Sequence, residues 1–409
     1  MFKRFAFLLL CCSFTLRADW NQALLAYEQQ DYNTARLHFS ELVKVGNANA
    51  MFSLAAMYFN GEGQDADKVQ AAALFKLAAD FGHADATALA AQLGASLQPA
   101  EQTNYAQMVQ QWQQQVMVPA GPAMLTRPSV ATAAQPIRRV EPRYPVDAAR
   151  RGQSGYVKMH YRVDEQGRVT DIMVLDAYPQ QLFIKEALKA LQSWRYSSGS
   201  PQLTVTELSF TLEIPGQARL NIPRLEQALF QSKLWDLAVA GSAEHQLILS
   251  QLLRHLVTQG AHHFIIDPAL PLTAPDLNLL QPELTVKADF TTIAQQTLVT
   301  VDPSGVITTA EADPALIGKQ LSGVKTAGQF LLEPRTVNTK AEVFVQPALT
   351  VSRAWSADYW LEQAARNGQI DAQRNLAATD QHWLNYLLAK QDPVAISWQA
   401  TGLLAQHNH

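Results

Sequence analysis

The sequence predicts an α+β protein in which a small antiparallel sheet with one packed helix is flanked by pairs of α-helices. Residues 155–163 alternate strictly between apolar and polar side chains, which is typical of a β-strand with one buried face. Residues 182–194 place apolar side chains at helical spacing, and residues 204–214 alternate again. Before and after this stretch, apolar residues recur at three- and four-residue steps, which indicates helices.

Composition limits the classes of protein to which the chain can belong. Its 409 residues are enough for several domains, and an apolar fraction of 48% is that of an ordinary globular protein. The formal net charge of −4 provides no basic surface of the kind that nucleic acids require, so no nucleic-acid partner is expected.

The first 18 residues have the layout of a secretory signal. Lys3 and Arg4 are followed by an apolar run of about ten residues, which is half of the roughly twenty residues needed to span a bilayer. Ala18, just before Asp19, is a small residue of the kind that precedes a cleavage site. We therefore expect export and cleavage after Ala18, while retention as an inner-membrane anchor and lipid attachment at Cys11 remain alternatives. Both cysteines, Cys11 and Cys12, lie in this segment, so the mature chain is expected to have no disulfide.

Residues 19–97 have the periodicity of several short helices. The pattern is broken at Gly61-Glu62-Gly63 and at Gly82, where glycine permits tight turns between antiparallel helices. The phrase AMFSLAAMYFNGEGQDADKVQAAALFKLAADFGHADA closely resembles the SEL-like repeat, a relative of the tetratricopeptide repeat. This resemblance implies stacked helix hairpins that bind other proteins.

Helical segments are also expected elsewhere in the chain. YWLEQAARNGQIDAQRNL, at residues 359–376, has a similar spacing of alanine and glycine, so residues 353–409 are interpreted as further SEL-like helices and a tail. Residues 217–263 are interpreted as a helical hairpin. Residues 98–135 are expected to form one more helix and then a flexible linker rich in Pro, Ala and Thr.

The pattern of the central unit, residues 136–216, predicts a β-hairpin, then a helix, and then a final strand. Asp164-Glu165-Gln166-Gly167 is expected to form a turn after the first strand, and Val169 to Leu175 to form the return strand. In the last strand one set of side chains is expected to point inward: Leu208, Phe210, Leu212 and Ile214. The other set is expected to point outward: Glu207, Ser209, Thr211 and Glu213.

The same unit resembles a known family. The matching residues are Tyr144-Pro145, Gly155, Val157, Val163-Asp164, Gly167, Val169, Ala187-Leu188 and Trp194-Arg195-Tyr196. In order and spacing they follow the pattern of the TonB C-terminal domain. The resemblance implies a periplasmic domain of Gram-negative bacteria that pairs with a short peptide at the N-terminus of outer-membrane transporters.

The candidate functional site is the edge of the last strand, from Thr204 to Ile214. An unpaired edge can accept an extended peptide through main-chain hydrogen bonds. The alternatives are that flanking helices cover this edge and that Tyr144-Pro145 serves in a turn or in packing. The predicted partner-binding residues are Tyr144, Pro145, Thr204, Glu207, Ser209, Phe210, Thr211 and Glu213.

Residues 264–352 are predicted to be β-rich and to include a degenerate second copy of the same unit. YRVDEQGRVTDIMV and VTVDPSGVITTAEA share Val-Asp, a two-residue gap, Gly, and then Val or Ile and Thr. A helix-like run from Pro314 to Phe330 follows the second turn, and a final strand follows that run. An unrelated hairpin with an ordinary turn is the alternative. The Tyr-Pro and Trp-Arg-Tyr signatures are absent here, so a binding role for this segment stays open.

No pattern typical of an enzyme was found. The sequence has neither a glycine-rich phosphate loop nor a Gly-x-Ser-x-Gly elbow. His262 and His263 are adjacent and would point to opposite faces of a strand, so they are interpreted as a surface loop rather than as a metal chelate. We therefore expect no catalytic residue, no cofactor, no metal and no small-molecule substrate.

The sequence thus predicts a non-enzymatic periplasmic interaction protein that binds an extended peptide of an outer-membrane or envelope protein by strand addition. A membrane-anchored energy transducer of the TonB type is the alternative. A homodimer formed through the same edges also stays open. The expected organisation is 1–18 signal peptide, 19–97 helical repeats, 98–135 helix and linker, 136–216 TonB-like domain, 217–263 helical hairpin, 264–352 β-rich segment, and 353–409 helices and tail.

Overall fold

The computed structural model describes residues 19–121, 135–199, 201–211, 222–259, 262–280, 286–337 and 339–407. The expected signal peptide and most of the expected linker lie outside these residues. The chain divides into two compact units. Unit 1 comprises Met1–Arg127 and Arg366–Thr401, and unit 2 comprises Pro128–Ala365 and Gly402–His409. No helix among the described residues is long and apolar enough to cross a membrane.

Unit 1 is helical, as the apolar periodicity predicts. Several of its helices begin at Asp or Asn side chains that accept backbone N–H groups, and α3 ends at Gly61 with a φ of 71°. Its helices are α1 (Trp20–Glu28), α2 (Tyr32–Lys44), α3 (Ala48–Asn60), α4 (Lys68–Asp80), α5 (Ala86–Ser96), α6 (Pro99–Gln115), α13 (Ile370–Ala377), α14 (Gln381–Ala389) and α15 (Pro393–His407) up to Thr401.

The two ends of the chain share unit 1. The backbone N–H of Trp20 donates to the oxygen of Asn367 at 3.1 Å, and Lys390 pairs with the carboxylate of Glu41. The C-terminal helices therefore extend the N-terminal helical array instead of forming a separate body.

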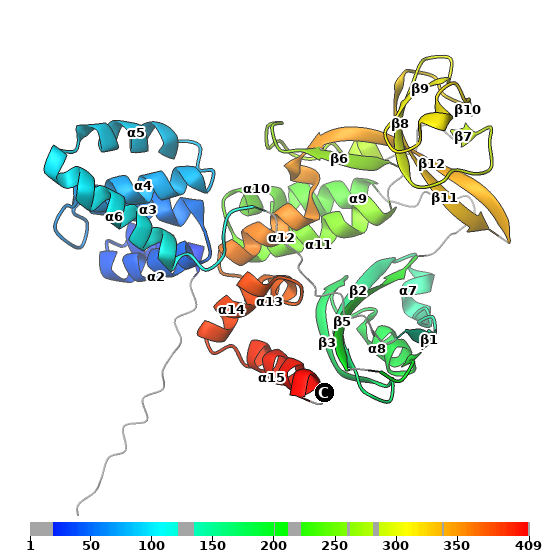
Figure 1. The fold of residues 1–409 in the computed structure, drawn as a ribbon, viewed down its shortest axis with the longest axis horizontal. Helices are drawn as coiled ribbons and strands as arrows, with labels where there is room; N and C mark the ends of the chain where they lie inside the picture. The colour runs from blue at the N-terminus through cyan, green and yellow to red at the C-terminus, as the bar shows by residue number, and fades with distance from the viewer. Residues whose placement is uncertain are drawn as a thin grey trace, which may run out of the picture. The chain divides into compact units, whose positions relative to one another are not determined.

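The first part of unit 2 forms the predicted helix on a small sheet. Its three-stranded sheet has the order β3-β2-β5, and β1 pairs with β4 beside it. Helix α8 lies along this sheet (Figure 1), where Ala187 and Leu191 belong to the same core as Val157 and Met159. The elements are β1 (Pro136–Arg138), α7 (Val146–Arg150), β2 (Gly155–Val163), β3 (Val169–Tyr178), α8 (Ile184–Gln192), β4 (Arg195–Tyr196) and β5 (Gln202–Phe210).

The prediction that β2 has only one buried face was wrong. Tyr156 is 2% exposed and His160 is 4% exposed, although both lie on the face opposite α8. Asp176 accepts hydrogen bonds there from the Tyr156 hydroxyl at 2.8 Å and from the Gln251 side chain of α11 at 2.7 Å. Polar residues can be buried on this face because their partners are supplied by neighbouring elements.

The remainder of unit 2 combines helices with a five-stranded sheet. That sheet has the order β6-β12-β11-β8-β9, with β6 parallel to β12, and β10 pairs with β7. The helices are α9 (Ile222–Glu226), the π-helix η1 (Gln227–Gln231), α10 (Leu234–Val239), α11 (Ala243–Gln259) and α12 (Ala357–Arg366), with 3-10 turns η2 (Leu277–Leu280), η3 (Pro314–Leu316) and η4 (Arg353–Trp355). The strands are β6 (His263–Asp267), β7 (Lys287–Ala288), β8 (Thr297–Val301), β9 (Ile307–Ala310), β10 (Leu321–Ser322), β11 (Gly328–Val337) and β12 (Lys340–Ser352).

Two expectations for this region were wrong. The run from Pro314 to Phe330 is not a helix, because Gly318 and Gly323 have φ values of 86° and 83° and the chain after η3 pairs with other strands. His262 is not in a surface loop, since it is only 8% exposed.

Candidate functional site: the open edge of strand β5

Strand β5 lies at one edge of its sheet. It pairs with β2 from Gly155 opposite Phe210 to Val163 opposite Gln202. Within the described ranges, no second strand pairs with β5. The strand starts and ends earlier than the sequence predicted: Thr211 is already outside it, and Glu213 lies outside the described residues.

Alternation along β2 determines which groups of β5 face the open edge. The N–H of Asp164 donates to the oxygen of Arg168 at 2.9 Å, so the main chain of Asp164 faces β3. The register shifts between β2 and β3 place the extra residues in β3, so β2 alternates without interruption. Val163 and every second residue before it therefore face β5.

It follows that the even-numbered residues of β5 direct their main-chain groups toward β2. The intervening residues direct theirs away from the sheet. These open-edge positions are Leu203, Val205, Glu207 and Ser209. The main-chain groups of Leu203 and Val205 therefore belong to the site. These two residues were missing from the predicted site, because its members were chosen by their side chains.

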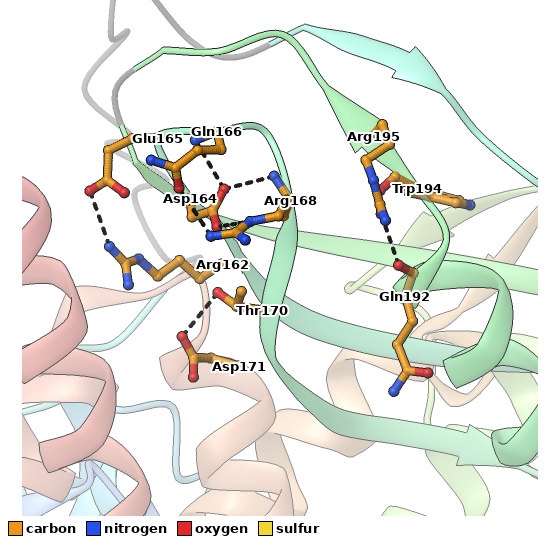
Figure 2. A network of polar contacts seen from close by, with 10 residues as sticks. All are labelled: Arg162, Asp164, Glu165, Gln166, Arg168, Thr170, Asp171, Gln192, Trp194 and Arg195. Carbon is orange, nitrogen blue, oxygen red and sulfur yellow. Dashed lines mark hydrogen bonds and ion pairs between the residues drawn. The ribbon is translucent and has the colours of Figure 1, made fainter.

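A tight turn fixes the register of β2. One oxygen of Asp164 accepts the N–H groups of Gln166 at 3.0 Å and Arg168 at 2.8 Å, and the other accepts Nε of Arg168 at 2.8 Å (Figure 2). Burial opposes ionisation of Asp164, but these hydrogen bonds outweigh it and lower the pKa of the carboxyl. Arg162 pairs with Glu165 at 3.6 Å, and Arg195 donates to the oxygen of Gln192 at 3.0 Å (Figure 2).

The predicted outward side chains of β5 lie where the alternation places them. Glu207, Ser209 and Thr211 are exposed, whereas Thr204 is half-buried and Phe210 is 2% exposed. Phe210 is thus a core residue, which stacks on Phe183 with ring centroids 4.4 Å apart.

Tyr144 and Pro145 lie behind the strand rather than along its edge. The Tyr144 hydroxyl donates to the oxygen of Gln153 at 2.6 Å, and its ring meets those of Phe183 and Phe210 at 5.7 and 6.0 Å. Pro145 is the residue before α7. The ring of Tyr144 packs against Phe210 of β5, and a direct contact of Tyr144 or Pro145 with a partner stays a prediction.

A row of charged side chains crosses the sheet beside the open edge. Lys158 of β2 lies opposite Asp176 of β3 on one side and opposite Glu207 of β5 on the other. Although the Glu207 side chain is exposed, neighbouring groups desolvate it in part and raise its pKa, while the positive charges of Arg254 and Lys158 act in the other direction. The described residues include no group of three or more His, Cys, Asp or Glu that could hold a metal.

Comparison with known proteins assigns the region around β5. Residues 140–214 match the family described as Gram-negative bacterial TonB protein C-terminal. Protein TonB of Yersinia enterocolitica is 33% identical over 87 residues, which are 21% of this chain and 34% of that protein. Protein TonB of Escherichia coli (strain K12) is 36% identical over 73 residues, which are 18% of this chain and 30% of that protein.

The chain thus spans about a third of the length of these curated relatives. The solution structure of the Pseudomonas aeruginosa TonB CTD is 31% identical and covers 20% of this chain and 88% of that chain, with a TM-score of 0.19. Residues 140–214 are a TonB C-terminal domain, and the N-terminal helical region is assigned to no family by these comparisons.

Proposed function

We propose that the TonB C-terminal domain at residues 140–214 captures an extended peptide of an outer-membrane or envelope protein along the open edge of β5. The domain implies an interaction role of the TonB family, which is non-enzymatic, periplasmic and directed at outer-membrane proteins. Strand addition is the mode of binding that the edge of β5 favours.

The observation that supports this proposal most directly is the alternation of the main chain. Leu203, Val205, Glu207 and Ser209 each present an N–H and a C=O along a strand edge that no other described strand occupies. Each such hydrogen bond contributes about 1 kcal/mol net, and because association and the ordering of the peptide oppose this gain, we expect weak, reversible binding.

The row of charged side chains favours a partner peptide that carries a positively charged residue. Asp176, Lys158 and Glu207 alternate in sign across three neighbouring strands. A peptide strand added beside β5 continues this alternation if it places Lys or Arg opposite Glu207, because opposite charges on directly paired residues stabilise a sheet.

Ser209→Pro tests the strand addition. Its N–H faces the open edge, its side chain is exposed, and proline is tolerated at sheet edges. The matched control is Ser209→Ala, which removes the hydroxyl but keeps the N–H. The experiment measures capture of envelope proteins by immobilised protein, with hydrogen exchange of β5 amides in the captured complex.

We expect Ser209→Pro to reduce capture at least tenfold while Ser209→Ala resembles the wild type. Undiminished capture by a folded Ser209→Pro protein would rule out the proposal. Phe210→Pro is unsuitable, since the main chain of Phe210 faces β2 and its side chain is in the core.

A further inference from the structure

Residues 286–352 contain a second sheet built on the plan of the TonB C-terminal domain. We infer that β7 to β11 are a degenerate copy of β1 to β5, and that the edge equivalent to the open edge of β5 is occupied by the chain's own strand β12. That the edge of β11 can accept a strand from a partner rests on the function proposed for β5.

The order of the strands is the first evidence. The sheet of the TonB domain has the order β3-β2-β5, and the larger sheet contains β9-β8-β11 in the corresponding places. Beside the first sheet β1 pairs with β4, and beside the second β7 pairs with β10. All five strands thus have a counterpart with the same neighbours and the same order along the chain.

The two hairpin turns agree in atomic detail. Asp302 accepts the N–H of Val306 on its side chain at 3.0 Å and donates its own N–H to the oxygen of Val306 at 3.0 Å. Asp164 does the same with Arg168, at 2.8 and 2.9 Å. Hydrogen bonds lower the pKa of Asp302, first from Ser304 and then from the Val306 backbone, as hydrogen bonds lower that of Asp164.

The glycine of each turn meets the equivalent later strand. The oxygen of Gly167 accepts the N–H of Tyr196 at 2.9 Å, and that of Gly305 accepts the N–H of Leu321 at 2.8 Å. A Cβ on Gly167 would lie 2.0 Å from the oxygen of Tyr196, and one on Gly305 would lie 2.3 Å from the oxygen of Leu321. In both copies only glycine allows this close approach.

The register agrees as well. Val163, which precedes the first turn, pairs with Gln202 of β5, and Val301, which precedes the second, pairs with Gly328 of β11. Counting from these pairs, residues 203–210 of β5 correspond to residues 329–336 of β11. The largest difference is that a three-residue turn, Pro314–Leu316, stands where the first copy has α8.

Strand β12 lies along the edge of β11 that corresponds to the open edge of β5. It pairs from Gln329 opposite Ala348 to Val337 opposite Lys340. The main chain of Asp302 faces β9, because its N–H donates to the oxygen of Val306, and the main chain of Val301 therefore faces β11. Since Val301 pairs with Gly328, the next residue, Gln329, and every second residue after it in β11 direct their main-chain groups toward β12. Pro334 and Pro347 both occupy the other positions, where a missing N–H removes no hydrogen bond between β11 and β12.

Strand β12 therefore makes, within the chain, the contact that we propose for a partner peptide on β5. The second copy is then an acceptor that its own chain keeps filled, and β5 is the acceptor left for a partner. Strand β11 should bind a peptide only after β12 has been displaced.

Gln346→Pro is designed to displace β12. Gln346 lies opposite Leu331, at a position whose N–H faces β11, so proline removes a hydrogen bond and places a ring against that strand. Gln346→Ala keeps the N–H and is the matched control. The probe is a fluorescent synthetic peptide with the sequence KAEVFVQPALTVS, residues 340–352, added to the full chain.

We expect Gln346→Pro to bind this peptide at least tenfold more tightly than the wild type or Gln346→Ala. Hydrogen exchange should show the amides of Leu331, Glu333 and Arg335 exposed in the variant and protected again by the peptide. If Gln346→Pro leaves β12 paired or unfolds the unit, Phe344→Pro, opposite Glu333, replaces it.

An exposed β11 edge that takes no peptide would overturn the inference, and so would equal binding at β11 by the wild type. Exchange reports β5 and β11 separately. Failure at β11 is thus distinguishable from failure of the Ser209→Pro test at β5.

Discussion

The side-chain amide of Asn47 donates to the backbone oxygen of Arg366 at 2.9 Å, across 319 residues of sequence. Arg366 in turn donates through Nη2 to the oxygen of Pro119 at 2.9 Å, so the segment that leaves unit 1 after α6 and the segment that returns to it are hydrogen-bonded to each other. Unit 2 is therefore inserted into a helical array whose two parts hold together through buried polar contacts.

Asn47→Ala should destabilise unit 1. The substitution removes the cap of α3 and leaves the Arg366 oxygen and the Asn367 side chain without this donor. We expect the free energy of unfolding to fall by about 2–4 kcal/mol, the sum of a lost cap and a lost buried hydrogen bond. Urea unfolding followed by circular dichroism measures this loss.

Asn60→Ala is the control for that experiment, because Asn60 lies at the exposed end of the same helix. Its effect should stay within about 0.5 kcal/mol, as for most surface substitutions. Equal losses in the two variants would contradict the role assigned to Asn47.

Gly167→Ala should destabilise the TonB domain more than Gly152→Ala does. Both glycines have positive φ, 74° and 57°, but a Cβ on Gly167 would lie 2.0 Å from the oxygen of Tyr196, whereas one on Gly152 would meet nothing within 4 Å. We expect a loss of about 1 kcal/mol from the backbone at Gly152 and about 3 kcal/mol or more at Gly167. Chemical denaturation of the two variants compares them, and similar losses would show that the turn tolerates a side chain.

Local pattern predicted the secondary structure of the TonB domain and the helices of unit 1, but it did not predict the contacts between segments that are far apart in the sequence. The predicted bounds of β2, Gly155 and Val163, were correct. They could be predicted because the alternation of side chains and the glycine turn that follows are both properties of residues close together in the sequence. The burial of Tyr156 and His160 could not be predicted, because the covering helix α11 begins some 80 residues later in the chain. The predicted strand, Thr204 to Ile214, begins two residues after the start of β5 and ends four residues after its end, and Phe210, which was expected to point inward and was also named as partner-binding, lies in the core.

The second sheet shows the same limit. Its turn was recognisable because Asp302 and Gly305 repeat the spacing of Asp164 and Gly167. Strands β11 and β12 follow one another in the chain and pair as a hairpin, whereas residues 314–330 were expected to be helical because the spacing of a few apolar residues does not by itself separate a helix from a strand.

Tyr144→Phe should separate packing from partner binding at this position. The variant keeps the ring between Phe183 and Phe210 and removes only the hydrogen bond to the oxygen of Gln153. We expect a loss of about 1 kcal/mol in stability and unchanged capture of the partner. Unfolding by urea and the capture assay used for Ser209→Pro measure the two effects. Loss of capture by a fully folded variant would instead make the Tyr144 hydroxyl a partner contact.

His255 should make the stability of unit 2 depend on pH. The residue is 6% exposed, lies 3.1 Å from the Ser154 hydroxyl and packs on the ring of Tyr178, and burial lowers its pKa to about 4. The unfolded chain binds a proton near the ordinary pKa of about 6.5, whereas the folded chain does so only near 4. The contribution of neutral His255 is therefore fully present above pH 6.5 and is lost as the pH falls toward 4.

The expected loss across this window is about 2–3 kcal/mol. His255→Gln keeps a polar side chain of similar size and cannot titrate, so the slope of unfolding free energy against pH between 6.5 and 4 should flatten relative to the wild type. Urea unfolding at half-unit pH steps measures both slopes. Asp176 on the same face is common to both proteins, and its raised pKa therefore cancels in the comparison. Identical slopes would mean that His255 takes up its proton in the folded state as readily as in the unfolded chain, which its enclosure by Ser154 and Tyr178 opposes.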